Sequence, residues 1–248
     1  MDTFPSKTSI ADTNGGENSI GFTKLGAGTL VLGGASTYTG PTLVEAGTLK
    51  VNGSLATSGV LVKSGAVLGG SGTIAGSVIV DSGARISPGN SPGTLTTGSE
   101  TWTGGGGYVW EINKADGTKG SSPGWDWLNI DGDLTLASTS GDKFTIYVHS
   151  LTLGGAAGPA TGFVYGQTYT YPIVTASGPI ADFSPDLFLI DHSAFSTNLG
   201  TLGTFAIEQS LDGTSINLVF TAVPEPRDTA VAVAALLAVV VLLRRRCA

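Results

Sequence analysis

The feature that most constrains this chain is a short repeat of fixed period. The segments TLVEAGTLKV, VLVKSGAVLG and VIVDSGARIS fall into register, and Gly47, Gly65 and Gly83 follow one another at equal intervals. A fixed period of about 20 residues is typical of a solenoid, in which successive turns of chain stack on one another. Each glycine would form a corner, because it accepts backbone angles that a Cβ atom forbids. The repeat therefore predicts a coil of two or three short strands per turn.

Columns of matching residues predict the inner and outer faces of this coil. One column is apolar in all three copies: Val44, Val62 and Val80. The next column is charged in all three copies: Glu45, Lys63 and Asp81. Alternation along a strand places the valines inside and the charged residues outside. A third column shares the charged face, and either turns a corner or covers another surface: Leu43, Leu61 and Ile79. A β-sandwich whose turns happen to recur is the alternative fold.

Composition favours an all-β fold and limits the partners. Short runs of Val, Thr, Leu and Ile are separated by Gly, Asn, Ser and Pro, which is typical of short strands and tight turns. Without the residues from Arg227 onward, the chain holds 8 Lys and Arg against 18 Asp and Glu. A surface of that sign repels phosphate backbones, so we expect no nucleic-acid partner. Cys247 is the only cysteine, which excludes an internal disulfide framework and a cysteine-based metal site.

The segment from Phe22 to Val51 carries a family resemblance. Its sequence, FTKLGAGTLVLGGASTYTGPTLVEAGTLKV, resembles the autotransporter-associated β-strand repeat, also called the passenger-associated transport repeat. The segment after it, with the turn SPGNSPGTL at residues 87–95, is similar to the stretch that commonly follows this repeat. The resemblance implies a right-handed parallel β-helix that is usually exported, and it implies a scaffold rather than a particular chemistry.

The pattern divides the chain into four parts. We expect residues 1–19 to be poorly ordered and residues 20–98 to form the β-strand repeat solenoid. Residues 99–222 still alternate but less regularly, and they resemble the tail half of passenger-like proteins, which predicts a β-helix continuation or a cap. Within them the Asp212–Gly213 pair lies between two apolar runs, as a hairpin turn would. Residues 223–248 form a separate C-terminal signal.

Candidate chemistry is sparse along the chain. Acidic and amide side chains cluster in the stretch GWDWLNIDGDL: Asp126, Asn129, Asp131 and Asp133. Calcium prefers such oxygens, but their spacing does not fit an EF-hand loop, and turn-forming Asp and Asn explain the same residues. His149 and His192 lie in separate runs without a serine-centred motif, so we expect no catalytic triad. The sequence predicts no catalytic residue, no metal and no cofactor.

Four tryptophans offer the one candidate for ligand contact. They could form an aromatic platform for sugar rings, or they could pack in the interior near the cap. The four are Trp102, Trp110, Trp125 and Trp127.

The C-terminal segment predicts a membrane helix. Residues 230–243 read AVAVAALLAVVVLL, and Arg244, Arg245 and Arg246 follow directly. A helix over 229–243 would rise about 21 Å through its uncharged part, against a hydrocarbon core of about 30 Å. A buried core helix is the alternative, but the three arginines disfavour it. The positive-inside rule keeps arginines cytoplasmic and so places the preceding residues across the membrane.

The order of Pro-Glu-Pro, apolar helix and arginine cluster resembles the PEP-CTERM sorting signal of bacteria. The motif consists of Val223, Pro224, Glu225 and Pro226. The resemblance implies recognition by an exosortase, a membrane enzyme that cleaves near the motif and passes the protein to the cell surface or extracellular matrix. Substrates of this pathway carry a signal peptide, and MDTFPSKTSIADTNGG does not read as one, so we expect the natural start to lie upstream.

Two hypotheses about function follow. The first is an exported, non-enzymatic surface or matrix protein, whose precursor is anchored in the inner membrane with its C-terminus in the cytoplasm and whose partners include extracellular polysaccharide. The second is a carbohydrate-binding or polysaccharide-degrading protein on the same scaffold, with the segment 102–127 as its site. The sparse chemistry favours the first.

Overall fold

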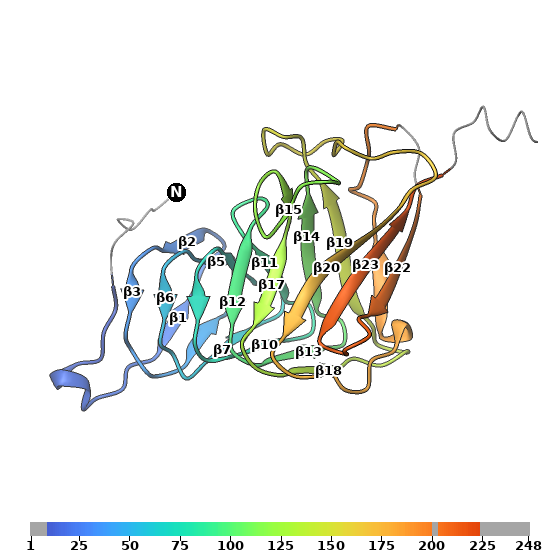
Figure 1. Ribbon diagram of the computed structural model, residues 1–248. Helices are drawn as coiled ribbons and strands as arrows, with labels where there is room; N and C mark the ends of the chain where they lie inside the picture. The colour runs from blue at the N-terminus through green and yellow to red at the C-terminus, as the bar shows by residue number, and fades with distance from the viewer. Residues whose placement is uncertain (1–8, 200–202, 224–248) are drawn as a thin grey trace, which may run out of the picture.

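The computed structural model describes residues 9–199 and 203–223, and over these residues the protein is all-β (Figure 1). The described helical structure consists of two short 3-10 segments, Asn14–Gly16 and Pro185–Leu187. Successive strands pass through three sheets in turn, so that each turn of chain adds one strand to each sheet. This stacked, parallel arrangement is that of a β-solenoid, as the repeat predicted.

Each sheet takes its strands from successive coils. The six-stranded sheet contains β1 (Phe22–Lys24), β4 (Thr42–Val44), β7 (Gly59–Val62), β10 (Ser77–Val80), β13 (Glu100–Thr103) and β18 (Leu134–Ala137). The nine-stranded sheet contains β2 (Thr29–Leu32), β5 (Thr48–Val51), β8 (Val67–Gly70), β11 (Arg85–Pro88), β14 (Gly107–Ile112), β15 (Thr118–Lys119), β16 (Gly124–Trp125), β19 (Phe144–Ser150) and β21 (Phe188–Asp191). The eight-stranded sheet contains β3 (Ala35–Ser36), β6 (Ser54–Leu55), β9 (Thr73–Ile74), β12 (Thr94–Thr97), β17 (Trp127–Ile130), β20 (Thr168–Ala176), β22 (Thr204–Gln209) and β23 (Ser215–Thr221).

Neighbouring coils pair in parallel and keep the register of the repeat. Val60 of β7 pairs with Val78 of β10, the same step along the chain as from Gly65 to Gly83. Gly47, Gly65 and Gly83 have φ angles of 66°, 80° and 76°, in the left-handed region that glycine tolerates best. The predicted glycine corners are therefore confirmed. The β-sandwich alternative is wrong, because the repeat strands pair in parallel within three sheets.

The predicted valine column lies on the inner face of the six-stranded sheet, and the charged column lies directly after the end of each of these strands. The valine column is fully buried: Val44, Val62 and Val80. In the charged column Glu45 is exposed, while Lys63 and Asp81 are partly exposed and form an ion pair of 3.4 Å. The third column, which the sequence left open, does not turn a corner. Its members lie side by side on the outer face, one per strand: Leu43, Leu61 and Ile79.

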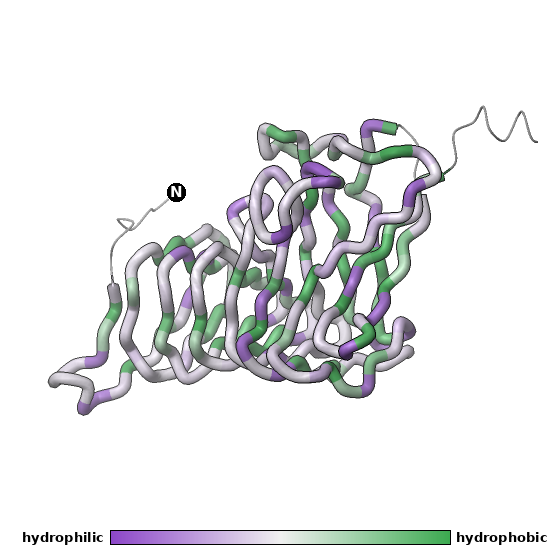
Figure 2. The backbone as a smooth tube through the Cα atoms, viewed as in Figure 1, coloured by the Kyte–Doolittle hydropathy of each residue, from purple (hydrophilic) through white to green (hydrophobic). Residues whose placement is uncertain are grey.

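The coils widen toward the C-terminus. Val60 pairs with Val78, Val78 with Glu100 and Glu100 with Leu134, so each step along the chain is longer than the one before it. A wider coil needs larger side chains to fill its interior at close-packed density. Aliphatic residues and Tyr38 fill the first coils, whereas in the wider part Trp102 stacks on Phe144 with ring centroids 4.3 Å apart and planes within 8°. Hydrophobic segments recur throughout the solenoid, from the first coils to the C-terminal cap (Figure 2).

An antiparallel hairpin ends the eight-stranded sheet. Strand β23 pairs antiparallel with both β20 and β22, which stops the parallel stacking on that side. The turn between β22 and β23 contains Asp212 and Gly213, whose φ is 75°, so the predicted hairpin turn is confirmed. Residues 99–222 thus contain both a continuation of the parallel coils, through β19 and β21, and a cap, the antiparallel hairpin.

The N-terminal segment folds back on the first coil. The Asp12 carboxylate accepts hydrogen bonds from the backbone N–H groups of Ile20, at 2.9 Å, and Thr39, at 3.0 Å. Residues 9–19, which we expected to be poorly ordered, are instead tied to the solenoid by these contacts.

The predicted membrane segment is not covered by the structure. In the ranges 9–199 and 203–223, no helix has the length and apolar character that a bilayer crossing requires. The predicted helix over 229–243 and the arginines after it lie outside the described residues.

Inserting one residue after Gly65 should destabilise the solenoid, whereas inserting a second copy of the complete repeat unit, residues 66–83, should be accepted. The single insertion moves the following strand by one position and turns buried Leu68 outward, which costs about 3 kcal/mol or more. The added unit only lengthens each sheet by one strand. Thermal unfolding followed by far-UV circular dichroism tests both variants, and equal melting temperatures would contradict the stacked register.

Candidate functional site

The outer face of the six-stranded sheet carries a stripe of uncharged side chains, aliphatic in its middle three strands and threonine in the others. Its central ladder holds one side chain from each coil: Thr23, Leu43, Leu61, Ile79, Thr101 and Thr135. Alternation puts these side chains outside because their neighbours along each strand fill the core. Ile79 remains 41% exposed, which is high for an aliphatic side chain in the middle of a sheet.

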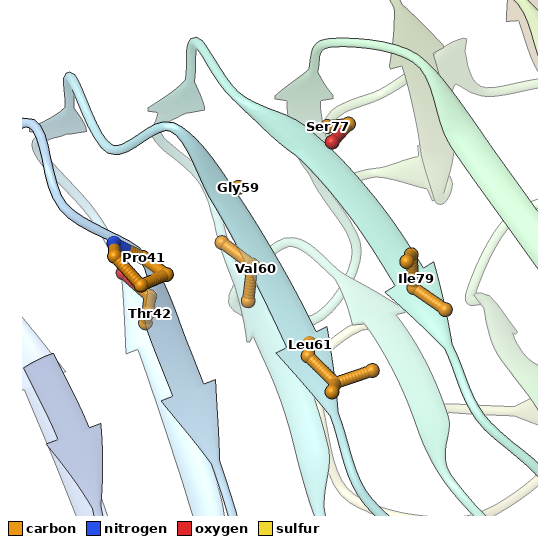
Figure 3. Close-up of a pocket in the computed structure, with 7 residues that line it drawn as sticks. All are labelled: Pro41, Thr42, Gly59, Val60, Leu61, Ser77 and Ile79. Carbon is orange, nitrogen blue, oxygen red and sulfur yellow. The ribbon is translucent and has the colours of Figure 1, made fainter. Parts of the chain in front are cut away.

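A shallow hollow of about 180 Å³ lies on this face (Figure 3). Gly59 has no side chain between Pro41 and Ser77, so the hollow forms at its position, beside Leu61 and Ile79. None of the residues that line it is charged or titratable. The hollow can therefore hold an apolar group, but it offers no acid, base or nucleophile.

A carboxylate that the sequence analysis missed lies inside the solenoid. Glu100 is 1% exposed, and it accepts hydrogen bonds from the Thr97 hydroxyl, at 2.8 Å, and from Trp102 Nε1, at 2.7 Å. Burial raises the pKa of Glu100 from 4.5 to about 7, although both hydrogen bonds oppose the shift. Glu100 and the buried Trp102 are two residues apart on β13, so the alternation that places the valines inside could have found this position.

Asp126 has a structural role. Its two carboxylate oxygens accept hydrogen bonds from the backbone N–H groups of Gly93, at 2.7 Å, and Glu111, at 3.0 Å. Burial raises the pKa of Asp126 well above its usual value, and the nearby Glu111 adds to the shift. Asp126 thereby ties the turn at residues 87–95 to β14, where the hydroxyl of Ser91 also donates to Glu111 at 2.6 Å.

The predicted acidic cluster does not converge on one point. Asp126 is fully buried, whereas Asp131 and Asp133 are exposed on the loop after β17, and Asn129 points outward from that strand. Within the described ranges, no group of three or more His, Cys, Asp or Glu side chains is arranged to hold a metal.

The tryptophans do not form one platform. Trp102 and Trp110 are buried, at 0% and 1% exposure, so neither can present a ring to a sugar, and the packing interpretation holds for both. Trp125 is partly buried against Tyr171. Trp127 is partly exposed on the eight-stranded sheet, with the Lys119 ammonium 3.9 Å from its ring centroid.

The two histidines lie on different elements, and both are close enough to Asp191 to interact with its carboxylate electrostatically. His149 stands on β19 beside Glu111 of β14, while His192 stacks on Phe205 with centroids 5.4 Å apart. Neither arrangement supplies a nucleophile with an oriented base.

Residues 22–51 match the family model described as Passenger-associated-transport-repeat. These residues run from β1 to the end of β5, which is the first coil and part of the second. No curated protein matches the chain. The match supports the resemblance to the autotransporter-associated repeat family, and it suggests a surface-related passenger protein.

The predicted sorting motif falls at the boundary of the structure. Val223 follows the cap, and the N–H of Gly166 donates to its carbonyl at 3.0 Å. The remainder of the motif, Pro224, Glu225 and Pro226, and the stop at Arg244, Arg245 and Arg246 lie outside the described residues.

Glu100→Gln should remove a loss of stability that the wild-type chain suffers as pH rises. Because the folded-state pKa of Glu100 is raised to about 7, its contribution is fully present below about 4.5 and is lost between there and about 7, a difference of about 3 kcal/mol. A Gln amide can still accept from Trp102 and can donate to Thr97. The variant should therefore be the more stable protein at pH 8.

Chemical denaturation at pH 5 and pH 8 measures this difference. Glu45→Gln serves as the control, since Glu45 is exposed on the same side of the solenoid and its replacement should leave the pH profile unchanged. If Glu100→Gln and the wild type show the same dependence of stability on pH, Glu100 does not titrate inside the core.

Proposed function

We propose that the chain is an exported, non-enzymatic structural protein, displayed as a β-solenoid at the cell surface or in the extracellular matrix. In this proposal an exosortase-type enzyme sorts it through the motif at 223–226, after a precursor stage in which the helix over 229–243 anchors it in the inner membrane with its C-terminus in the cytoplasm. The passenger repeat at residues 22–51 supports the surface location.

One observation carries the non-enzymatic part of the proposal. The two strongly perturbed carboxylates, Glu100 and Asp126, are buried and direct their hydrogen bonds to the protein itself. Perturbed carboxylates are the usual candidates for general acid or base, but these two face no cleft. The burial of Trp102 and Trp110 also removes half of the aromatic platform on which the polysaccharide-degrading alternative depended.

Intact mass of the protein recovered from a native host, with and without its exosortase, tests the sorting. We expect loss of the segment after Pro226 only in the host that has the enzyme. A mass that does not depend on the enzyme, with the three arginines retained in the membrane fraction, would mean a simple C-terminal anchor and would contradict the sorting proposal.

A reducing-sugar release assay tests the non-enzymatic proposal separately. The full chain should release no sugar from a broad panel of neutral and acidic polysaccharides. The matched variant is Glu111→Gln, which leaves the backbone hydrogen bonds to Asp126 in place. Turnover by the wild-type chain that this variant abolishes would establish an enzyme and overturn the proposal.

A further inference from the structure

The outer face of the six-stranded sheet leaves aliphatic side chains in contact with solvent. Leu43, Leu61 and Ile79 lie side by side on neighbouring strands, and we call these three residues the aliphatic row. Strands β4, β7 and β10 contain no charged residue, and the charged column lies beyond their ends. An apolar centre with a charged rim is the arrangement found at interfaces between proteins.

The hollow at Gly59 lies next to the aliphatic row (Figure 3). Gly59 and Leu61 both occupy outward positions of β7, because Val60 and Val62 are buried in the core. The two outward positions are two residues apart, which is about 6.6 Å along a strand. A protruding side chain and a hollow of about 180 Å³ therefore stand beside each other on one strand.

A second copy of the chain is complementary to this face. A two-fold axis that runs parallel to the solenoid axis, between the positions of Gly59 and Leu61, exchanges these two positions. The Leu61 side chain of each copy then enters the hollow of the other copy. The same operation places the other two aliphatic side chains over Pro41 and Ser77, which continue the register of Gly59 on the neighbouring strands.

We infer that two copies of this chain associate face to face through their six-stranded sheets and point in the same direction along the solenoid axis. Each copy uses the same residues, so the contact closes on itself and forms a dimer rather than a fibre. Copies that point in opposite directions are less complementary. Their two-fold axis would run along the strands and would put aliphatic row against aliphatic row and hollow against hollow, which forfeits dispersion contacts at the hollows.

The direction of pairing suits the proposed function. A two-fold axis parallel to the solenoid places residue 223 of both copies at the same height, as two chains held by one membrane require. This agreement rests on the proposed display at the cell surface, whereas the complementarity of the two faces does not.

The size of the face determines how strongly two copies associate. Six strands that are about 4.8 Å apart and about four residues long give a face of roughly 350 Å² per copy. A stable complex buries about 800 Å² per partner, so this contact belongs to the weak and transient class. The chain is therefore a monomer in dilute solution, and it pairs where neighbours are concentrated, as on a surface.

Sedimentation equilibrium of the purified full chain over a wide concentration range, in one detergent throughout, tests the inference. We expect a monomer–dimer equilibrium for the wild type. Leu61→Glu brings a carboxylate into each hollow, and it should weaken the dimer at least tenfold. Val67→Glu is the matched control, since Val67 is a partly exposed, outward aliphatic residue of β8 in a different sheet. Its dimer should be as strong as that of the wild type.

Mixing two variants tests the direction of pairing. Gly59→Val fills the hollow, and its Cβ atom meets Ser77 at 3.2 Å, a contact that small shifts relieve. Leu61→Ala removes the protruding side chain. Each variant alone should dimerise several-fold more weakly than the wild type. A mixture should associate more strongly than either, because the mixed dimer keeps one native Leu61–Gly59 contact and sets the alanine against the filled hollow.

Three results would overturn the inference. They are a wild type that stays monomeric at every concentration, an association that Leu61→Glu leaves as strong as Val67→Glu does, and a mixture that associates no better than its components. Association common to all variants would belong to another surface or to the apolar C-terminal segment. Circular dichroism shows whether each variant is folded. The mass of the sorted protein does not depend on these results, so failure of the sorting proposal is detected separately.

Discussion

The structure depends on parallel backbone pairing between coils that repeat in register. Val60 pairs with Val78 one coil later, and this register decides which residues of the strand face inward and which face outward. The next strand in the sheet then has the same inward and outward positions. The corners must then return the chain to the same place on each turn. Glycines with positive φ at positions 47, 65 and 83 meet this need without the strain that a Cβ atom would bring. The valine column follows from this geometry, because alternation along each strand directs these side chains into the core.

Stacking also decides where polar groups must be neutralised. Lys24 occupies the position equivalent to Val44 in the first coil, and its side chain is only 6% exposed. It is tolerated because its ammonium donates to the carbonyls of Leu25, Gly26 and Ala46, at 2.7 to 2.9 Å. Glu100 occupies the equivalent of Val78 in a later coil, where Thr97 and Trp102 satisfy it. In each case an inward position has been given to a charged residue, and local donors or acceptors compensate for lost solvation.

The parts of the fold that could be predicted from the sequence are those for which the same signal occurs in several copies or in a short local motif. The corners, the valine column and the Asp212–Gly213 turn each rest on a local rule that tertiary packing did not override. The position of Leu61 could not be predicted, because an apolar residue on a charged face fits either a corner or an outer surface. The contact between Arg85 and Tyr147 could not be predicted either. Arg85 and Tyr147 are far apart in the sequence, and only the lengths of the intervening loops bring them onto one face, with β14 between their strands.

The inner and outer columns of side chains are therefore under different constraints. Inside, each side chain must fit the coil before and after it, so even carboxylates such as Asp126 become part of the scaffold and hold a turn in place. Outside, a side chain must only avoid its neighbours, and two faces of one solenoid differ accordingly. The six-stranded sheet presents aliphatic residues around Gly59, while the nine-stranded sheet presents charged residues of both signs and the Tyr147 ring over Gly107. Gly59 leaves a hollow beside larger outward side chains, and Gly107 lets the Tyr147 ring lie against the sheet, so the outer surface is shaped as much by where its columns omit a side chain as by where they place one.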